Sequence, residues 1–181
     1  MGKIINSTFV SIDGVINHMD AWHFDYTDDE TDRITLEQIM ASDAMLMGRH
    51  TYDVYASAWP EREGAYPDRI NSIRKYVAST TLDKPDWNNT TVLEGDVVEE
   101  VTKLKQELDG EIVIPASYQL GRTLIEHDLV DALRLVVFPV VLGAGERFFI
   151  QDSDKRPMRL VDTKGIGDGL VLLNYEFIRE G

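Results

Sequence analysis

Apolar positions along the chain fall into short continuous runs and into stretches with helical spacing. The longest run lies within Leu129–Phe149: it covers Leu133–Phe138, is interrupted by Pro139, and resumes over Val140–Leu142 before Gly143–Gly145. Most of its residues are β-branched, aliphatic or aromatic, which predicts a strand buried on both faces, around which the other elements can be placed. Proline cannot donate to a strand ladder, so Pro139 marks a bulge or the point where this strand becomes an edge.

Shorter apolar runs predict the remaining strands. They lie at Lys3–Val10, Ala44–Met47, Arg74–Ala78, Thr91–Leu93 and Glu111–Ile114. Met158–Val161 and Leu170–Ile178 predict a final antiparallel hairpin, with the glycines of residues 165–169 near its turn.

Helical spacing and capping residues separate these strands. Thr27–Glu30 predicts a capping box, with Thr27 as the cap, for a helix that ends near Ser42; Asp96 repeats the signal, and Ser117 is a candidate cap for a later helix. The predicted inward residues are Ile34, Leu36, Ile39 and Met40 in the first helix, Val97, Val101, Leu104 and Leu108 in the second, and Leu120, Leu124 and Ile125 in the third. Residues 53–74 predict two more short helices. Alternating strands and helices indicate an α/β fold, with one domain over residues 1–181.

Composition narrows the class of protein. The chain has 181 residues, of which 43% are hydrophobic, and a net charge of −14, which repels nucleic acid and anionic membranes. No apolar run approaches the roughly 20 residues that a membrane span needs. The absence of cysteine excludes disulfides and thiolate metal sites. With no signal-peptide pattern at the amino terminus, we expect a cytoplasmic protein.

Three places combine the end of a predicted strand with the apparent start of a helix. They are Gly48–Thr51, Ser79–Thr81 and Pro115–Tyr118. Helix amino termini offer free amides and partial positive charge, so three of them at one sheet edge would suit a polyphosphate, with Arg49 and His50 as further partners. The alternative is that these Ser and Thr residues only cap helices, and the pattern alone favours that alternative.

Two motifs resemble a known family. Leu46–Tyr52 resembles the glycine–arginine–x–threonine–aromatic signature of dihydrofolate reductases, and Ser11–Ile16 with Leu129–Phe149 resembles the reductase domain of bifunctional riboflavin-biosynthesis proteins and their stand-alone relatives. The resemblance runs from about residue 3 to residue 178. It implies a three-layer α/β/α fold with a mixed central sheet, NADPH as cofactor, a homodimer, and reduction of a small heterocyclic or carbonyl-like substrate.

The resemblance also implies roles for individual residues. The loop Asp13–Ile16, including Gly14 and Ile16, would form the mouth for nicotinamide and substrate. The other implied cofactor residues are Gly48, Arg49, His50 and Thr51 at the phosphates, Ser79 and Thr80 at the adenosine end, and Ser117, Tyr118, Gln119 and Leu120 at the pyrophosphate.

One position departs from the family pattern. Relatives usually carry Gly-Gly or Gly-Ser where this chain has Ala116-Ser117 after Pro115. Glycine lets a phosphate approach the backbone closely, whereas Ala116 adds a Cβ and Pro115 lacks an amide donor. A non-catalytic dimeric protein that binds NADP or another small ligand is therefore the alternative function.

Candidate substrate residues each have a structural alternative. Asp13 is the candidate proton donor, and its alternative is a turn-forming Asp-Gly pair. Trp22 and Phe24 could stack on a flat ring or cover the core. Asp28 lies near the pterin-binding carboxylate of dihydrofolate reductases, but an electrostatic role at a helix amino terminus is favoured. The cluster His18, Asp20, His23 and Asp25 matches no metal motif, so no metal site is predicted.

Overall fold

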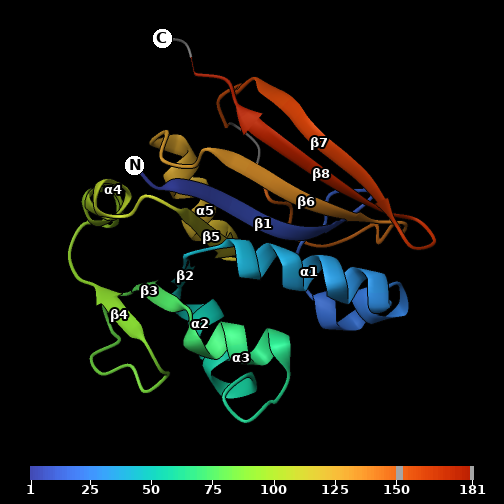
Figure 1. Cartoon of the computed structure of the whole chain (residues 1–181). Coiled ribbons are helices and arrows are strands. Elements are labelled where there is room, and N and C mark those ends of the chain that lie inside the picture. The colour runs from blue at the N-terminus through green and yellow to red at the C-terminus, as the bar shows by residue number, and fades with distance from the viewer. Residues whose placement is uncertain (150–152, 180–181) are drawn as a thin grey trace.

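The computed structural model describes residues 1–149 and 153–179 (Figure 1). Within these residues, strands form one sheet in the order β4-β3-β2-β5-β1-β6-β8-β7. The strands are β1 (Lys3–Ser11), β2 (Ala44–Gly48), β3 (Arg74–Ala78), β4 (Thr90–Leu93), β5 (Glu111–Pro115), β6 (Ala132–Phe138), β7 (Met158–Ile166) and β8 (Leu170–Phe177). The helices are α1 (Asp29–Ala41), α2 (Arg49–Ala58), α3 (Ala65–Ser72), α4 (Val97–Glu107) and α5 (Tyr118–Glu126), with the short 3-10 helices η1 (Met19–Ala21) and η2 (His23–Asp25) before α1.

The sheet is parallel from β4 to β6 and antiparallel beyond it. β8 runs against β6, and β7 runs against β8. β1 has a parallel partner on each side, because Ile5 pairs with Val113 of β5 and with Ala132 of β6. The carboxyl ends of the parallel strands therefore lie at one edge of the sheet, which we call the carboxyl edge. This arrangement confirms the predicted mixed sheet with a C-terminal antiparallel hairpin.

Helices cover both faces of the sheet, with α1, α2 and α3 on one side and α4 and α5 on the other (Figure 1). Alternate residues of β2 show the division: Leu46 packs in the apolar cluster with residues of α4 and α5, whereas Met45 and Met47 pack in the cluster with residues of α1, α2 and α3. The predicted three-layer α/β/α fold is thus confirmed. Among residues 1–149 and 153–179, no helix is long and apolar enough to cross a membrane.

Two predictions about the long apolar run need correction. β6 ends at Phe138, and the strand does not resume over Val140–Leu142. The amide of Val140 donates to the carbonyl of Phe138 over 2.8 Å, so the chain turns at Pro139 and leaves the ladder. The centre of the sheet is also different, since β1 and β5 lie deeper within it than β6.

Three local predictions near helix termini were also wrong. Asp28, rather than Thr27, caps α1: its carboxylate accepts from the amides of Glu30 and Thr31, at 3.1 and 3.0 Å, and Thr31 closes the capping box. Met40 is 58% exposed instead of facing inward. Residues 79–81 do not start a helix, because the chain passes from β3 through a loop to β4.

Lys75 of β3 is completely buried. Its ammonium donates to the carbonyl oxygens of Asn71 and Ile73, both at 2.9 Å, and of Asn88 at 2.8 Å. The same nitrogen lies 4.5 Å from the centre of the Trp87 ring. Lys75 thus fixes the end of α3 to the loop before β4. Burial lowers the pKa of Lys75 to about 8.

The stability of the protein should depend on pH through Lys75. The ordinary pKa of lysine is 10.5, so between pH 8 and 10.5 the unfolded state binds this proton more tightly than the folded state. Above pH 10.5 the amine is neutral in both states, and the free energy of unfolding has its highest value. As the pH falls to about 8, protonation of the unfolded state lowers the free energy of unfolding. We expect the free energy of unfolding of the wild type, relative to Lys75→Met, to rise with pH across this window in urea titrations.

Lys103→Met, which changes an exposed lysine of α4, is the matched control and should show no such rise. A difference between wild type and Lys75→Met that stays constant from pH 8 to pH 10.5 would contradict the lowered pKa.

Candidate functional site

Three turns meet at the carboxyl edge because β3, β2 and β5 are neighbours in the sheet. β2 passes directly into α2 at Gly48, and β5 passes through Ala116 and Ser117 into α5. The third turn begins at Ser79, after β3. The predicted grouping of these three segments at one edge follows from the strand order, although only two of them start helices.

Ser117 links the two helix-starting turns. Its Oγ accepts a hydrogen bond from the amide of Gly48 at 3.1 Å and donates to Oγ1 of Thr51 at 2.7 Å. Both hydroxyl-bearing residues are buried, with 9% exposure for Ser117 and 8% for Thr51. The prediction that Ser117 caps α5 is therefore wrong. Its side chain instead holds the first turn of α2 against the first turn of α5.

The helices that start near this edge differ in their caps. α1 and α4 begin at Asp28 and Asp96, whose carboxylates accept from first-turn amides. α2 and α5 begin at Gly48 and Ser117 without any side-chain cap. Their first-turn amides are thus left for another acceptor, and their combined partial positive charge favours an anion.

Arg49 adds a full positive charge beside these turns. Its Nε donates to Asp53 Oδ1 at 2.9 Å, and one terminal nitrogen donates to Thr81 Oγ1 at 3.0 Å. The Oγ of Ser79 in turn accepts from the amides of Thr81 and Leu82. Arg49 therefore spans from α2 to the loop after β3. The nearby His50 and Thr80 are exposed.

The backbone of this region is open on one side. A Cβ added to Gly48 would meet no heavy atom within 4 Å, so open space lies directly against this backbone. Ala116 and Ser117 have positive φ values of 50° and 42°. The Asn6 amide donates to the Ala116 carbonyl at 3.2 Å, and the Ala116 amide donates to the Ser7 carbonyl at 3.0 Å. The turn is thus held open in a left-handed conformation without glycine.

Asp13, the candidate proton donor, joins two loops beside the ends of β1 and β6. Its carboxylate accepts from Ser11 Oγ at 2.6 Å and from the amides of Leu142 and Gly143 at 3.1 and 2.8 Å. These bonds, led by that of Ser11, lower the pKa of Asp13 to about 2. Asp13 is therefore ionised at neutral pH, and its contacts favour the turn-forming alternative over proton donation.

The second loop, residues 139–149, is also joined to the first by backbone contacts. The amide of Ile16 donates to the carbonyl of Glu146 at 2.9 Å, and the Glu146 amide donates to Asn17 Oδ1 at 2.9 Å. Gly145 has a φ of 140°, and an added Cβ would lie 2.4 Å from a Val15 methyl. Sequence reasoning missed Asn17 and Gly145, because no local pattern indicates a contact across about 130 positions. Gly14 and Ile16 are fixed within this two-loop assembly.

The three predicted substrate residues have different environments. Trp22 is 6% exposed and packs edge-on against Phe138, with its indole nitrogen bonded to the Asn17 carbonyl, so it belongs to the core. Phe24 is 69% exposed, and its ring lies 3.8 Å from that of His23. Asp28 caps α1, and bonds from Thr31 lower its pKa. Phe24 alone among the three offers an exposed ring.

Among residues 1–149 and 153–179, no three His, Asp or Glu side chains are grouped so that they could hold a metal ion.

The chain is similar to known proteins over nearly its whole length. A family model described as RibD C-terminal domain matches residues 2–172. The uncharacterized protein YyaP of Bacillus subtilis is 28% identical over 180 residues, which cover 97% of this chain and 95% of the relative. The predicted resemblance to the riboflavin-biosynthesis reductase domain is confirmed.

Solved structures share the fold. A putative riboflavin biosynthesis protein from Shewanella sp. PV-4 has a TM-score of 0.79 at 20% identity, covering 98% of this chain and 99% of the other. A dihydrofolate reductase from Enterococcus faecalis, complexed with NADP(H), has a TM-score of 0.66 at 16% identity, covering 97% and 96%. The dihydrofolate-reductase-like fold is therefore confirmed.

Asp13 should stabilise the folded protein in a pH-dependent manner. Its pKa is lowered from 3.8 to about 2, so its contribution is present above pH 3.8 and is lost as the pH falls through about 2. We expect the difference in melting temperature between wild type and Asp13→Asn to be constant from pH 5 to pH 7 and to shrink towards pH 2. Asp20→Asn, at an exposed position before α1, is the control. A pH-independent difference for Asp13→Asn would show that its carboxylate does not hold the loops together.

Proposed function

The chain belongs to the RibD C-terminal domain family, and we propose that it is an NADPH-dependent reductase that transfers a hydride to a small heterocyclic or carbonyl-like substrate. The fold relates it to reductases of riboflavin biosynthesis and to dihydrofolate reductase. The observation that carries the proposal is the pair of uncapped helix termini, α2 and α5, that Ser117 joins beside Arg49.

The phosphates of NADPH would be bound by the first-turn amides of α2 and α5. Arg49 would supply a positive charge, which the net charge of −14 otherwise makes scarce. Thr51 would act through Ser117, because its hydroxyl is buried and bonded to that residue. Ser79 and Thr80 lie on the loop that Arg49 reaches through Thr81, which suits the adenosine end.

The nicotinamide supplies a hydride when NADPH is bound, and the chain positions the reacting groups and excludes water. Asp13 holds the loops 12–17 and 139–149 together as one wall of the mouth. The exposed ring of Phe24 offers a surface for a flat substrate. Trp22 and Asp28 fix the segment that carries Phe24, the first by packing and the second by capping α1.

A second candidate function is binding of NADP or another small ligand without turnover. It is favoured by the engagement of the Asp13 carboxylate, the candidate proton donor, in loop contacts. Oxidation of NADPH by the purified protein with heterocyclic and carbonyl substrates distinguishes the two functions. We also propose a cytoplasmic location, which the cysteine-free composition supports.

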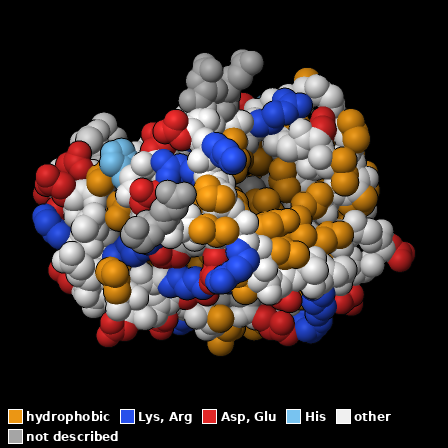
Figure 2. Space-filling model, turned by 90° about the horizontal axis from the view of Figure 1, so that it is seen from above, with side chains coloured by type: hydrophobic (Ala, Val, Ile, Leu, Met, Phe, Trp, Pro, Cys, Tyr) orange, Lys and Arg blue, Asp and Glu red, His pale blue; other side chains and the backbone are white. Residues whose placement is uncertain are grey.

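We further propose that a second copy of the chain covers the outer face of β6, β8 and β7. Side chains alternate along these strands, so the residues opposite the α1 side share one face. They include Leu135 and Val137 of β6, Val171, Leu173 and Tyr175 of β8, and Met158 and Leu160 of β7. Figure 2 shows hydrophobic side chains gathered around a hollow in the surface seen from above. A large exposed apolar patch is typical of an interface.

Replacing Arg49 should weaken NADPH binding more than NADH binding if Arg49 faces the 2′-phosphate. Loss of one charge-assisted hydrogen bond costs about 1.5–3 kcal/mol, which is roughly a 10- to 150-fold change in dissociation constant. We expect this loss for NADPH with Arg49→Ala in titrations followed by nicotinamide fluorescence, and little change for NADH.

Arg33→Ala is a matched control, because Arg33 pairs with Glu37 on α1 just as Arg49 pairs with Asp53 on α2, four residues apart. An equal loss for both cofactors would instead place Arg49 at the pyrophosphate. Unchanged binding of both cofactors would refute the site.

A charge on the proposed interface should separate the two copies. Leu160 is 47% exposed on β7, and Leu160→Lys would place an unpaired ammonium in the interface. We expect light scattering after size exclusion to give a dimer mass for the wild type and a monomer mass for Leu160→Lys. Met40→Lys, at a 58% exposed position on α1, should remain dimeric. A monomeric wild type would rule out the dimer.

A further inference from the structure

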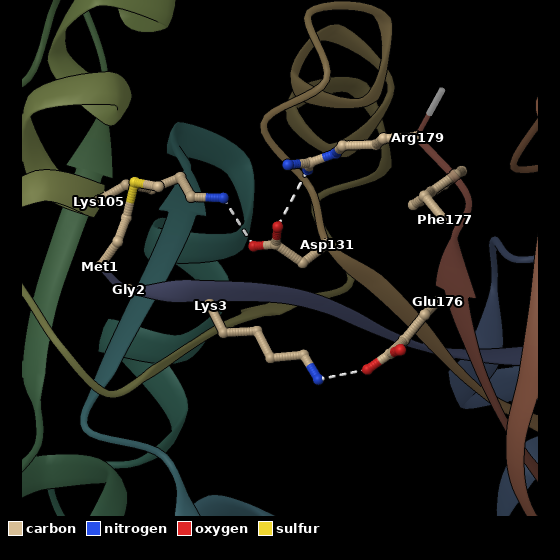
Figure 3. Close-up of a pocket in the computed structure, with 8 residues that line it drawn as sticks. All are labelled: Met1, Gly2, Lys3, Lys105, Asp131, Glu176, Phe177 and Arg179. Atoms are coloured by element: carbon tan, nitrogen blue, oxygen red, sulfur yellow. Dashed lines mark hydrogen bonds and ion pairs between the residues drawn. The ribbon is translucent and has the colours of Figure 1, made fainter. Parts of the chain in front are cut away.

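A cavity of about 360 Å³ lies at the edge of the sheet opposite the carboxyl edge, where β1 and β6 begin and β8 ends (Figure 3). Its lining comes from segments far apart in the sequence: the start of the chain, α4, the segment before β6 and the end of the chain. The lining residues are Met1, Gly2, Lys3, Lys105, Asp131, Glu176, Phe177 and Arg179. A cavity of this size accommodates a small organic molecule.

The cavity is rich in positive charge. Asp131 lies between two cations, with Lys105 Nζ at 2.6 Å and an Arg179 nitrogen at 3.0 Å (Figure 3). Glu176 likewise lies between Lys3 at 2.7 Å and Arg159 at 2.9 Å. Among the lining residues, the cations Lys3, Lys105 and Arg179 outnumber the carboxylates Asp131 and Glu176 by one, in a chain whose net charge is −14.

The cations differ in how many of their donors are already engaged. Lys105 is 5% exposed and also donates to the Leu129 carbonyl, so it belongs to the buried framework. Arg179 directs one terminal nitrogen to Asp131 and to the Val130 carbonyl, and its side chain is 45% exposed. Lys3 is 50% exposed and bonds to Glu176 through one of three N–H groups. Lys3 and Arg179 thus keep donor capacity at the mouth of the cavity.

An apolar wall accompanies these donors. Phe177 is partly buried and packs against the apolar cluster under α4 and α5, and it lines the same cavity as Lys3 and Arg179. A ligand that satisfies both features carries an oxyanion for the cations and a compact carbon skeleton for the ring. We infer that this cavity binds a small organic oxyanion, a carboxylate or a phosphate ester, through Lys3 and Arg179.

This site is separate from the proposed cofactor site, since the two lie at opposite edges of the sheet. The proposal therefore does not depend on reductase activity. Because both sites would attract phosphate, a test needs a readout that tells them apart. Backbone amides near each site supply it: Gly2 and Phe177 report on the cavity, and Gly48 and Tyr118 report on the carboxyl edge.

The test is a titration of the isotope-labelled full chain with inorganic phosphate and, separately, with benzoate, at constant ionic strength, followed by amide chemical shifts. We expect saturable shifts at Gly2 and Phe177. The double variant Lys3→Gln/Arg179→Gln should weaken the dissociation constant at these amides about tenfold or more, the effect of losing a charge-assisted hydrogen bond. Both substitutions leave the buried pair Lys105–Asp131 in place, so the double variant should keep the fold.

Arg62→Gln, which changes a cation beside Trp59 on the α2 side, is the control and should leave the shifts at Gly2 and Phe177 unchanged. Saturation with benzoate alone would identify a carboxylate ligand, and saturation with phosphate alone a phosphate ester. Absence of saturable shifts with both probes would overturn the proposal. So would shifts that persist unchanged in the double variant, because they would not arise from Lys3 and Arg179.

Discussion

Parallel pairing on both sides of β1 is the constraint on which the rest of the structure depends. Asp131 sets the register of this pairing through two hydrogen bonds to Ile4. Its carboxylate accepts from the Ile4 amide at 2.8 Å, and its own amide donates to the Ile4 carbonyl at 2.9 Å. With that register set, the carboxyl ends of β1, β2 and β5 reach the same edge. Gly48 ends β2, and Asp13 and Ser117 follow β1 and β5, so residues more than 100 positions apart lie at a single edge.

The same pairing explains why cations gather at the opposite edge of the sheet, where β1 and β6 begin. Asp131 accepts from Ile4 through its carboxylate, and a partly buried carboxylate requires compensation. Lys105 and Arg179 provide it, which brings α4 and the end of the chain to the start of β1. The cations that hold the sheet in register thus also form the cavity wall.

At the carboxyl edge, the distribution of aspartates carries the functional argument. Among the described α-helices, α2, α3 and α5 begin without a side-chain cap. α1 and α4 have carboxylate caps, and they follow β1 and β4 along the chain. α2 and α5 follow the adjacent strands β2 and β5 and lack caps. An anion bound between them would complete the hydrogen bonding that the side chains leave unfinished.

The sequence predicted which segments form strands and helices much better than it predicted what single polar residues do. Apolar periodicity is local, so β2, β5 and the inward face of α4 were placed correctly. Ser117 was predicted as a helix cap from its position alone, yet its partners Gly48 and Thr51 are more than 60 residues away. Thr27 failed as a cap for a different reason, because Asp28 next to it is the stronger acceptor. The loop role of Asp13 likewise depends on Leu142 and Gly143, which only the fold brings near.

Pro115 and Ala116, which depart from the family pattern, lie where β5 passes into the turn before α5. Pro115 is the last residue of β5 and pairs with Ser7. The amide of Ala116 already donates to the Ser7 carbonyl, so a glycine at this position would offer no further donor. What Ala116 costs is a left-handed conformation, about 1–2 kcal/mol for a residue with a Cβ. That cost falls on folding stability, and the amides of α5 that would face a phosphate begin only after Ser117. The substitution therefore bears on how rigidly the turn is held more than on whether the cofactor can bind.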